Sequence, residues 1–235
     1  MPYRRLPNTN QARLRALRKA IEMGKAIPYN DIPFPTELLR EAESKYRLFR
    51  SAIEYYNQCL TNQAQANRKH QENAKKARLY VSHFIQVLNL SVIREEIKAS
   101  LKSLYGLEED THTLPDLSSE SALLQWGRKI IGGEELRMLE GGTPIYNPTI
   151  AKVKVLFNIF EETYTIQKNL QRITQQSLNQ LSEHIPTIDA IILNIWDAIE
   201  EKHKNLPKEE SIISCQKFGV VYYYRKKKTA KLDKE

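Results

Sequence analysis

The stretch TELLREAESKYRLFRSAIEYYNQCL, residues 36–60, decides the fold class. Its apolar residues recur every three or four positions, from Leu38 through Phe49 and Ile53 to Leu60. An α-helix completes a turn every 3.6 residues, so this spacing places them on one stripe. The sequence therefore predicts a long amphipathic helix that starts near residue 36.

Helical patterns also precede and follow this stretch. Asn8 or Thr9 can cap a first helix that ends near Met23, and a further helix is expected over about 74–104. Between the first two helices, AIPYNDIPFP contains three prolines, which exclude regular helix. We expect a turn in the polar segment TNQAQANRKHQENA, although it contains no Gly or Pro to mark the position.

The second half of the chain has a similar pattern. After loops and two short helices, Asn147 and Pro148 predict the start of another long helix, because Pro is favoured at the first helical position. Pro186 begins or kinks a last helix, which ends at NLP, residues 205–207.

A constant offset of 111 residues aligns the apolar patterns of the two halves. It pairs Phe49 with Phe160 in one helix and Phe84 with Ile195 in the next. This repeat predicts a duplicated helical hairpin, and two such hairpins would form an elongated antiparallel bundle of four long helices. The alternative is that any two amphipathic helices can be aligned in some register.

We therefore expect an all-α fold in one structural domain. Only 8 glycines in 235 residues is about half the usual share, which argues against a loop-rich or all-β fold. The expected segments are a basic N-terminal helix with a Pro-rich linker (1–35), a first long hairpin (36–106), a short-helix insertion (107–147), a second long hairpin (148–206) and an extended Tyr-rich strip with a basic tail (207–235).

The net charge of +8 is concentrated at the two ends of the chain. Residues 1–26 hold seven Lys or Arg and one Glu, and residues 222–235 hold six Lys or Arg and two acidic residues. Charge of this kind either attracts a polyanion or keeps a protein soluble.

The stretch FGVVYYYRKKK, residues 218–228, combines aromatic, β-branched and basic residues. It predicts an extended segment, and MPYRRLP is similar in composition, so we expect the two termini to lie together. Tyrosines beside cations can bind single-stranded nucleic acid by stacking, or they can pack on the bundle, which the sequence favours. The candidate polyanion-binding residues are Arg4, Arg5, Arg225, Lys226, Lys227 and Lys228, and the candidate stacking residues are Tyr222, Tyr223 and Tyr224.

Metal and catalytic motifs are poorly represented. Two-metal sites in helical bundles need two inward Glu-x-x-His pairs, and the pair Glu200 and His203 lies in the charged segment EEKHKN, typical of a solvated face. His83 lies on the most apolar expected helix, so it is the candidate for a buried polar site. His70, in a polar segment, is assigned no role.

The glycine pairs around GGEELRMLEGG match neither phosphate-loop pattern, and neither Cys59 nor Cys215 has a metal, redox or catalytic spacing. We expect no cofactor, metal, disulfide, export signal or membrane span, and a cytoplasmic location. The expected function is that of a non-catalytic interaction or scaffold protein that self-associates or binds a protein partner. The alternative is nucleic-acid binding through the basic ends.

Several segments resemble a known group of proteins. They are MPYRRLPNTNQARLRAL, YVSHFIQVLNLSV, YGLEE, GGTPIYNPTI and FGVVYYYR. Over nearly the whole chain the sequence resembles an all-helical protein family of Bacteroides and its relatives, to which no function is attached. The resemblance implies a bacterial cytoplasmic origin and nothing about mechanism.

Overall fold

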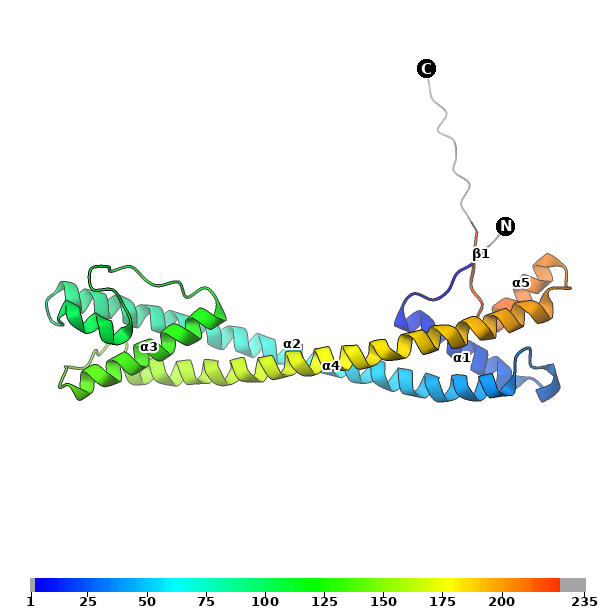
Figure 1. The fold of residues 1–235 in the computed structure, drawn as a ribbon, viewed down its shortest axis with the longest axis horizontal. Coiled ribbons are helices and arrows are strands. Elements are labelled where there is room, and N and C mark those ends of the chain that lie inside the picture. The colour runs from blue at the N-terminus through cyan, green and yellow to red at the C-terminus, as the bar shows by residue number, and fades with distance from the viewer. Residues whose placement is uncertain (1–2, 225–235) are drawn as a thin grey trace, which may run out of the picture. The chain divides into compact units, whose positions relative to one another are not determined.

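The structure is a computed structural model that describes residues 3–224 (Figure 1). The prediction of an all-α fold is confirmed, because almost all regular structure in this range is helical. The elements in chain order are β1 (Tyr3–Arg4), α1 (Asn10–Ala26), the 3₁₀ helix η1 (Tyr29–Asp31), α2 (Thr36–Ile93), the 3₁₀ helix η2 (Ala99–Tyr105), α3 (Glu120–Leu139), α4 (Ile150–His203), α5 (Lys208–Lys217) and β2 (Tyr222–Tyr223).

The prediction of two hairpins is wrong in one respect. Each of the two expected pairs of long helices is a single continuous helix. The turn expected after residue 60 is absent from α2, which is helical over 58 residues. Its polar middle, residues 61–74, contains no Gly or Pro and holds three Gln and three Ala, which have good helix propensity. Pro186 lies inside α4, which runs through it over 54 residues. The expected four long helices are therefore two.

Internal contacts divide the chain into two compact units. Unit 1 consists of Met1–Gln58 and Gln175–Glu235, and unit 2 consists of Cys59–Thr174. Within each unit, the N-terminal part of one long helix packs antiparallel to the C-terminal part of the other. Each unit has its own apolar core.

In unit 1, the long helices are joined by α1, α5 and the paired strands β1 (Tyr3–Arg4) and β2 (Tyr222–Tyr223). Arg13 of α1 donates two hydrogen bonds to Asp189 of α4, at 2.7 and 2.9 Å. β1 pairs antiparallel with β2, so the expectation that the termini lie together is confirmed. The largest fully buried side chains of its core are Leu17, Phe49 and Trp196.

In unit 2, the long helices are joined by η2 and α3, which contribute to the same core. Helices η2 and α3 approach closely at Gly133, where an added Cβ would lie 2.7 Å from the ring of Tyr105 and 2.8 Å from the carbonyl oxygen of Leu104. The core around them includes the fully buried side chains Phe84, Ile85, Leu88, Leu123, Ile130 and Phe160.

The short helices of the two units correspond in position. Thr9 caps α1 and Ser119 caps α3, 110 residues apart, and each side-chain oxygen accepts from the backbone N–H three residues on. Lys19 of α1 has its counterpart at the same offset in Lys129 of α3.

The turns that end η2 and α5 also correspond. Gly106 and Gly219 both have positive φ, and both lie against the lysine of the neighbouring short helix, Lys129 or Lys19. In each turn the residue after the glycine donates a backbone hydrogen bond five residues back, to Lys102 or Cys215. The two units therefore share a framework, and its origin by duplication stays a prediction.

Candidate functional site

A cavity of about 490 Å³ opens in unit 1 beside α1. Its α1 side is formed by residues spaced three or four apart, which lie on one face of the helix. The lining residues come from the segment before α1, from α1, from α4 and from the segment after α5: Arg5, Leu6, Pro7, Asn8, Thr9, Ala12, Arg15, Ala16, Arg18, Lys19, Glu22, Trp196, Gly219, Val221 and Tyr223. We call this cavity the basic pocket.

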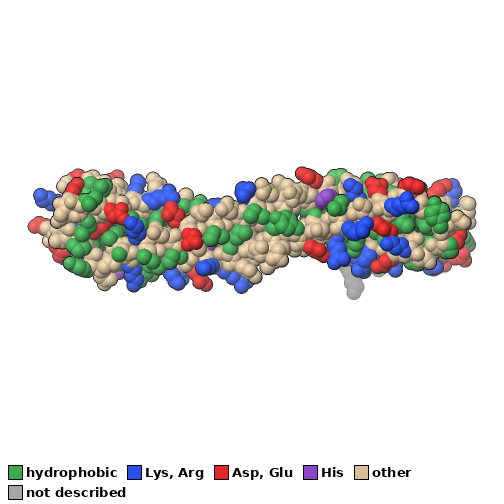
Figure 2. Space-filling model, turned by 90° about the horizontal axis from the view of Figure 1, so that it is seen from below, with side chains coloured by type: hydrophobic (Ala, Val, Ile, Leu, Met, Phe, Trp, Pro, Cys, Tyr) green, Lys and Arg blue, Asp and Glu red, His purple; other side chains and the backbone are tan. Residues whose placement is uncertain are grey.

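Three cations of the basic pocket have no acidic partner within residues 3–224: Arg5, Arg15 and Lys19. All three side chains are exposed. The fourth, Arg18, is 3.5 Å from Glu22. Figure 2 shows Lys and Arg side chains on one face of unit 1, with Asp and Glu side chains among them. Cations gathered without counter-charges produce a positive potential that attracts anions.

The neighbouring arginines are neutralised. Arg4 donates to Asp197 at 2.5 Å and to Glu200 at 2.9 Å, and Arg13 is held by Asp189. Arg4, a predicted polyanion-binding residue, therefore joins β1 to α4 in an ion-pair network. Arg5 faces the opposite way along the strand and lines the pocket, as side chains alternate in an extended segment.

The three tyrosines of the C-terminal strip have different surroundings. Tyr222 donates a 2.6 Å hydrogen bond to Glu200, and burial together with this bond raises the pKa of its hydroxyl above the usual value. Tyr223 lines the basic pocket and is 44% exposed, with the Arg5 guanidinium 5.0 Å from its ring centroid. Tyr224 is 71% exposed and does not line the pocket.

The structure thus brings together only some of the predicted site residues. Arg5 and Tyr223 share the pocket, while Arg225, Lys226, Lys227 and Lys228 lie outside the described residues. Arg15 and Lys19 were missed as site residues. Their spacing of four residues on a capped helix was visible in the sequence and could have indicated a common face.

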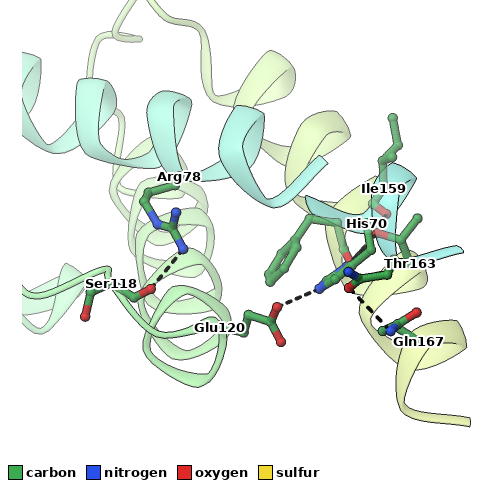
Figure 3. Close-up of polar contacts among 9 residues, drawn as sticks. His70, Arg78, Ser118, Glu120, Ile159, Thr163 and Gln167 are labelled. Atoms are coloured by element: carbon green, nitrogen blue, oxygen red, sulfur yellow. Dashed lines mark hydrogen bonds and ion pairs between the residues drawn. The ribbon is translucent and has the colours of Figure 1, made fainter. Parts of the chain in front are cut away.

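The prediction of a buried His83 is wrong, because this side chain is exposed on α2. The buried histidine is His70, which is 1% exposed. Its Nε2 lies 2.8 Å from Glu120 Oε1 of α3, and its Nδ1 lies 3.3 Å from Thr163 Oγ1 of α4 (Figure 3). The imidazole stacks on Phe160 with 5.7 Å between ring centroids.

The hydrogen-bonding partners of His70 lie on two other helices. Thr163 Oγ1 of α4 lies 3.3 Å from Nδ1 and also 3.0 Å from the carbonyl oxygens of Ile159 and Phe160, to which its hydroxyl can donate. The Glu120 carboxylate of α3 lies within hydrogen-bond distance of Nε2. His70 is therefore a buried link between α2, α3 and α4.

The other buried charged side chains of unit 2 are also engaged internally. Glu134 and Arg137, both almost fully buried, pair at 2.7 Å, and the Tyr105 hydroxyl bonds to both. Burial and the bond to Glu134 raise the pKa of Tyr105. The ammonium of Lys102 donates to the backbone carbonyls of Glu109 and Thr111, which fixes the loop after η2.

The structure offers no metal-binding cluster of three or more His, Cys, Asp or Glu side chains in residues 3–224. Glu200 and His203, which have the Glu-x-x-His spacing, make other contacts: Glu200 accepts from Arg4 and Tyr222, and His203 Nδ1 lies 2.8 Å from the carbonyl oxygen of Ile199. Cys59 and Cys215 are buried free thiols, and burial raises the pKa of Cys215.

The fold and the site define an all-α protein of two units with a basic pocket in one of them. Within residues 3–224 no helix is long and apolar enough to cross a membrane. No family of known proteins matches the chain, and neither a curated protein nor a solved structure shows significant similarity to it.

Proposed function

We propose that this chain is a non-catalytic binding protein whose basic pocket in unit 1 takes a polyanion. The observation that carries the proposal is the group of three cations, Arg5, Arg15 and Lys19, that surround one pocket without an acidic partner in residues 3–224. The neighbouring arginines Arg4 and Arg13 are neutralised by ion pairs, so they do not add to the charge of the pocket.

Binding of a polyanion is favourable here for two reasons. Several phosphates on one chain can contact several cations at once, and the counterions released on binding add entropy. Arg15 and Lys19 lie on α1, and the backbone of Arg5, directly after β1, is hydrogen-bonded to Val221, so little ordering of the backbone is required on binding.

The test is the binding of a labelled single-stranded oligonucleotide, titrated across salt. Lys19→Gln should weaken binding, because it removes a phosphate contact. Lys129→Gln is the matched control, because Lys129 occupies the corresponding position of α3 and lies over the Trp126 ring. Equal affinity of the two variants, or absence of binding at low salt, would contradict the proposal.

A second candidate function is self-association, which follows the expected scaffold role. Its observation is a pair of exposed apolar positions on each long helix: Leu48 and Tyr55 on α2, and Ile159 and Ile166 on α4. Within each pair the residues are seven apart, the spacing of a helix–helix contact, and the two pairs are related by the offset of 111. Figure 2 shows hydrophobic side chains reaching the surface in both units.

The charges beside these positions are complementary. Arg47 lies next to the α2 pair and Glu162 lies between the residues of the α4 pair, and neither has an ion-pair partner in the described part of the chain. The α2 face of one copy can therefore contact the α4 face of a second copy. Sedimentation should find a dimer that Ile159→Lys with Ile166→Lys dissociates, and a monomeric unmodified chain would overturn this candidate.

A further inference from the structure

The lining of the basic pocket has two chemical characters. Arg15 and Lys19 supply charge from one face of α1. Leu6, Pro7 and Val221 supply apolar surface to the same lining. A ligand made only of anionic groups would use the cations and leave the apolar surface unused. The lining therefore fits a ligand in which an apolar part and an anionic part alternate.

The aromatic side chain at this site is accessible. Tyr223 is 44% exposed, and Arg5 lies above its ring at 5.0 Å. A nucleobase can stack on the exposed part of the Tyr223 ring or on the guanidinium of Arg5, because every base has a π-face and stacks on aromatic and guanidinium planes.

The size of the cavity sets the size of the group that enters. A cavity of about 490 Å³ is within the range of small-ligand pockets, about 300–1,000 Å³, and can hold a single nucleotide. The cations continue along α1 on the exposed side, where a following phosphate can lie.

We infer that the basic pocket binds one nucleotide of a single-stranded nucleic acid, with the base against Tyr223 and the apolar lining and the adjoining phosphates on Arg15 and Lys19. This inference rests on the proposed function and adds the identity of the polyanion. A duplex fits less well, because its bases are stacked and paired inside and only its phosphates can reach the cations.

The test compares three ligands of equal length: oligo-dT, the same phosphodiester backbone without bases, and a duplex. The full-length chain should bind oligo-dT about tenfold tighter than the abasic strand, the gain expected from stacking of one base, and also tighter than the duplex. Equal binding of oligo-dT and the abasic strand would overturn the inference and leave the proposed function standing. Absence of binding to both at low salt would overturn both.

Variants locate the stacking surface. Tyr223→Ala should lower the affinity for oligo-dT about tenfold and leave the affinity for the abasic strand unchanged. Tyr223→Phe keeps the ring and should bind like the unmodified chain. Tyr224→Ala is the control, because Tyr224 is more exposed but does not line the pocket. An effect of Tyr224→Ala as large as that of Tyr223→Ala would contradict the assignment of the base to this pocket.

Discussion

Units 1 and 2 share a framework but differ in how they use their charges. In unit 1, Arg15 and Lys19 of α1 have no acidic partner within residues 3–224. In unit 2, the corresponding helix α3 has Arg128 paired with Glu161 and Arg137 paired with Glu134. Within one framework, the cations of the short helix can therefore either form ion pairs that hold helices together or remain without acidic partners around a pocket.

The segments that follow Gly106 in unit 2 and Gly219 in unit 1 also differ in whether side chains hold them in place. In unit 2, Lys102 and Asn89 hold the loop after Gly106 through its backbone carbonyls, and Arg78 holds the carbonyls of Leu117 and Ser118 just before α3. In unit 1, the segment after Gly219 forms β2 and carries Tyr223 to the pocket.

The largest effect is expected from Glu134→Ala. It leaves the guanidinium of Arg137 buried without its carboxylate, which costs about 3–5 kcal/mol in the free energy of unfolding. Denaturant unfolding measures it. Glu135→Ala is the control, since Glu135 is half exposed and pairs with exposed Lys154. Its cost should be below about 1 kcal/mol. Similar small losses in both variants would contradict a structural role for the buried pair.

Gly133→Ala should be the next most damaging change. The new Cβ would meet the Tyr105 ring and a backbone oxygen below 3.0 Å, and such overpacking costs about 1–3 kcal/mol. The neighbouring Gly132→Ala meets nothing within 4 Å, so it should stabilise α3 by about 0.5–1 kcal/mol. Thermal unfolding of both variants should give shifts of opposite sign, and shifts of the same sign would contradict the packing of α3 on η2.

His70→Gln should lower the free energy of unfolding by about 1–3 kcal/mol, because it removes the buried hydrogen-bonded link of the imidazole to Glu120 and Thr163. His83→Gln should change it by less than about 0.5 kcal/mol, since His83 is exposed. Denaturant unfolding at neutral pH compares the two. An equal loss of stability in the two variants would contradict the assignment of His70, rather than His83, as the histidine that stabilises the fold.

A smaller effect is expected at alkaline pH. Burial raises the pKa of Tyr105 and Tyr222 in the folded chain, whereas in the unfolded chain both ionise at about pH 10. The folded state then binds more protons, so stability is fully present below pH 10 and falls above it, by at most about 1.4 kcal/mol per pH unit per group. Tyr105→Phe should reduce this slope, measured by denaturant unfolding between pH 9 and 11, and an unchanged slope would contradict the assignment.

Much of the fold was predictable from the sequence. Apolar spacing gave the helices, and the similar composition of the two ends gave the pairing of β1 with β2. The continuity of α2 was missed because a polar segment was interpreted as a turn, although nothing in it breaks a helix. At Pro186 the helix loses one backbone donor, yet α4 continues, with apolar residues such as Ile188 buried in the unit 1 core.

The site was less predictable, because burial and ion pairing depend on residues far apart in the chain. Arg4 and Arg5 are adjacent, but Arg4 pairs with an acidic residue 193 positions away, whereas Arg5 has no acidic partner within residues 3–224. His70 lies in a polar stretch and is buried because Phe160 of α4 and Glu120 of α3 cover it. Neither difference follows from local composition.

The most direct test of the difference between the units is the salt dependence of oligonucleotide binding by two variants with equal net charge. Arg15→Gln with Lys19→Gln should reduce the slope of log affinity against log salt by about 2, because two phosphate contacts are lost. Arg128→Gln with Lys129→Gln should leave the slope of the unmodified chain unchanged. Equal reductions in both variants would mean that binding follows net charge alone, and would contradict the assignment of binding to the basic pocket of unit 1.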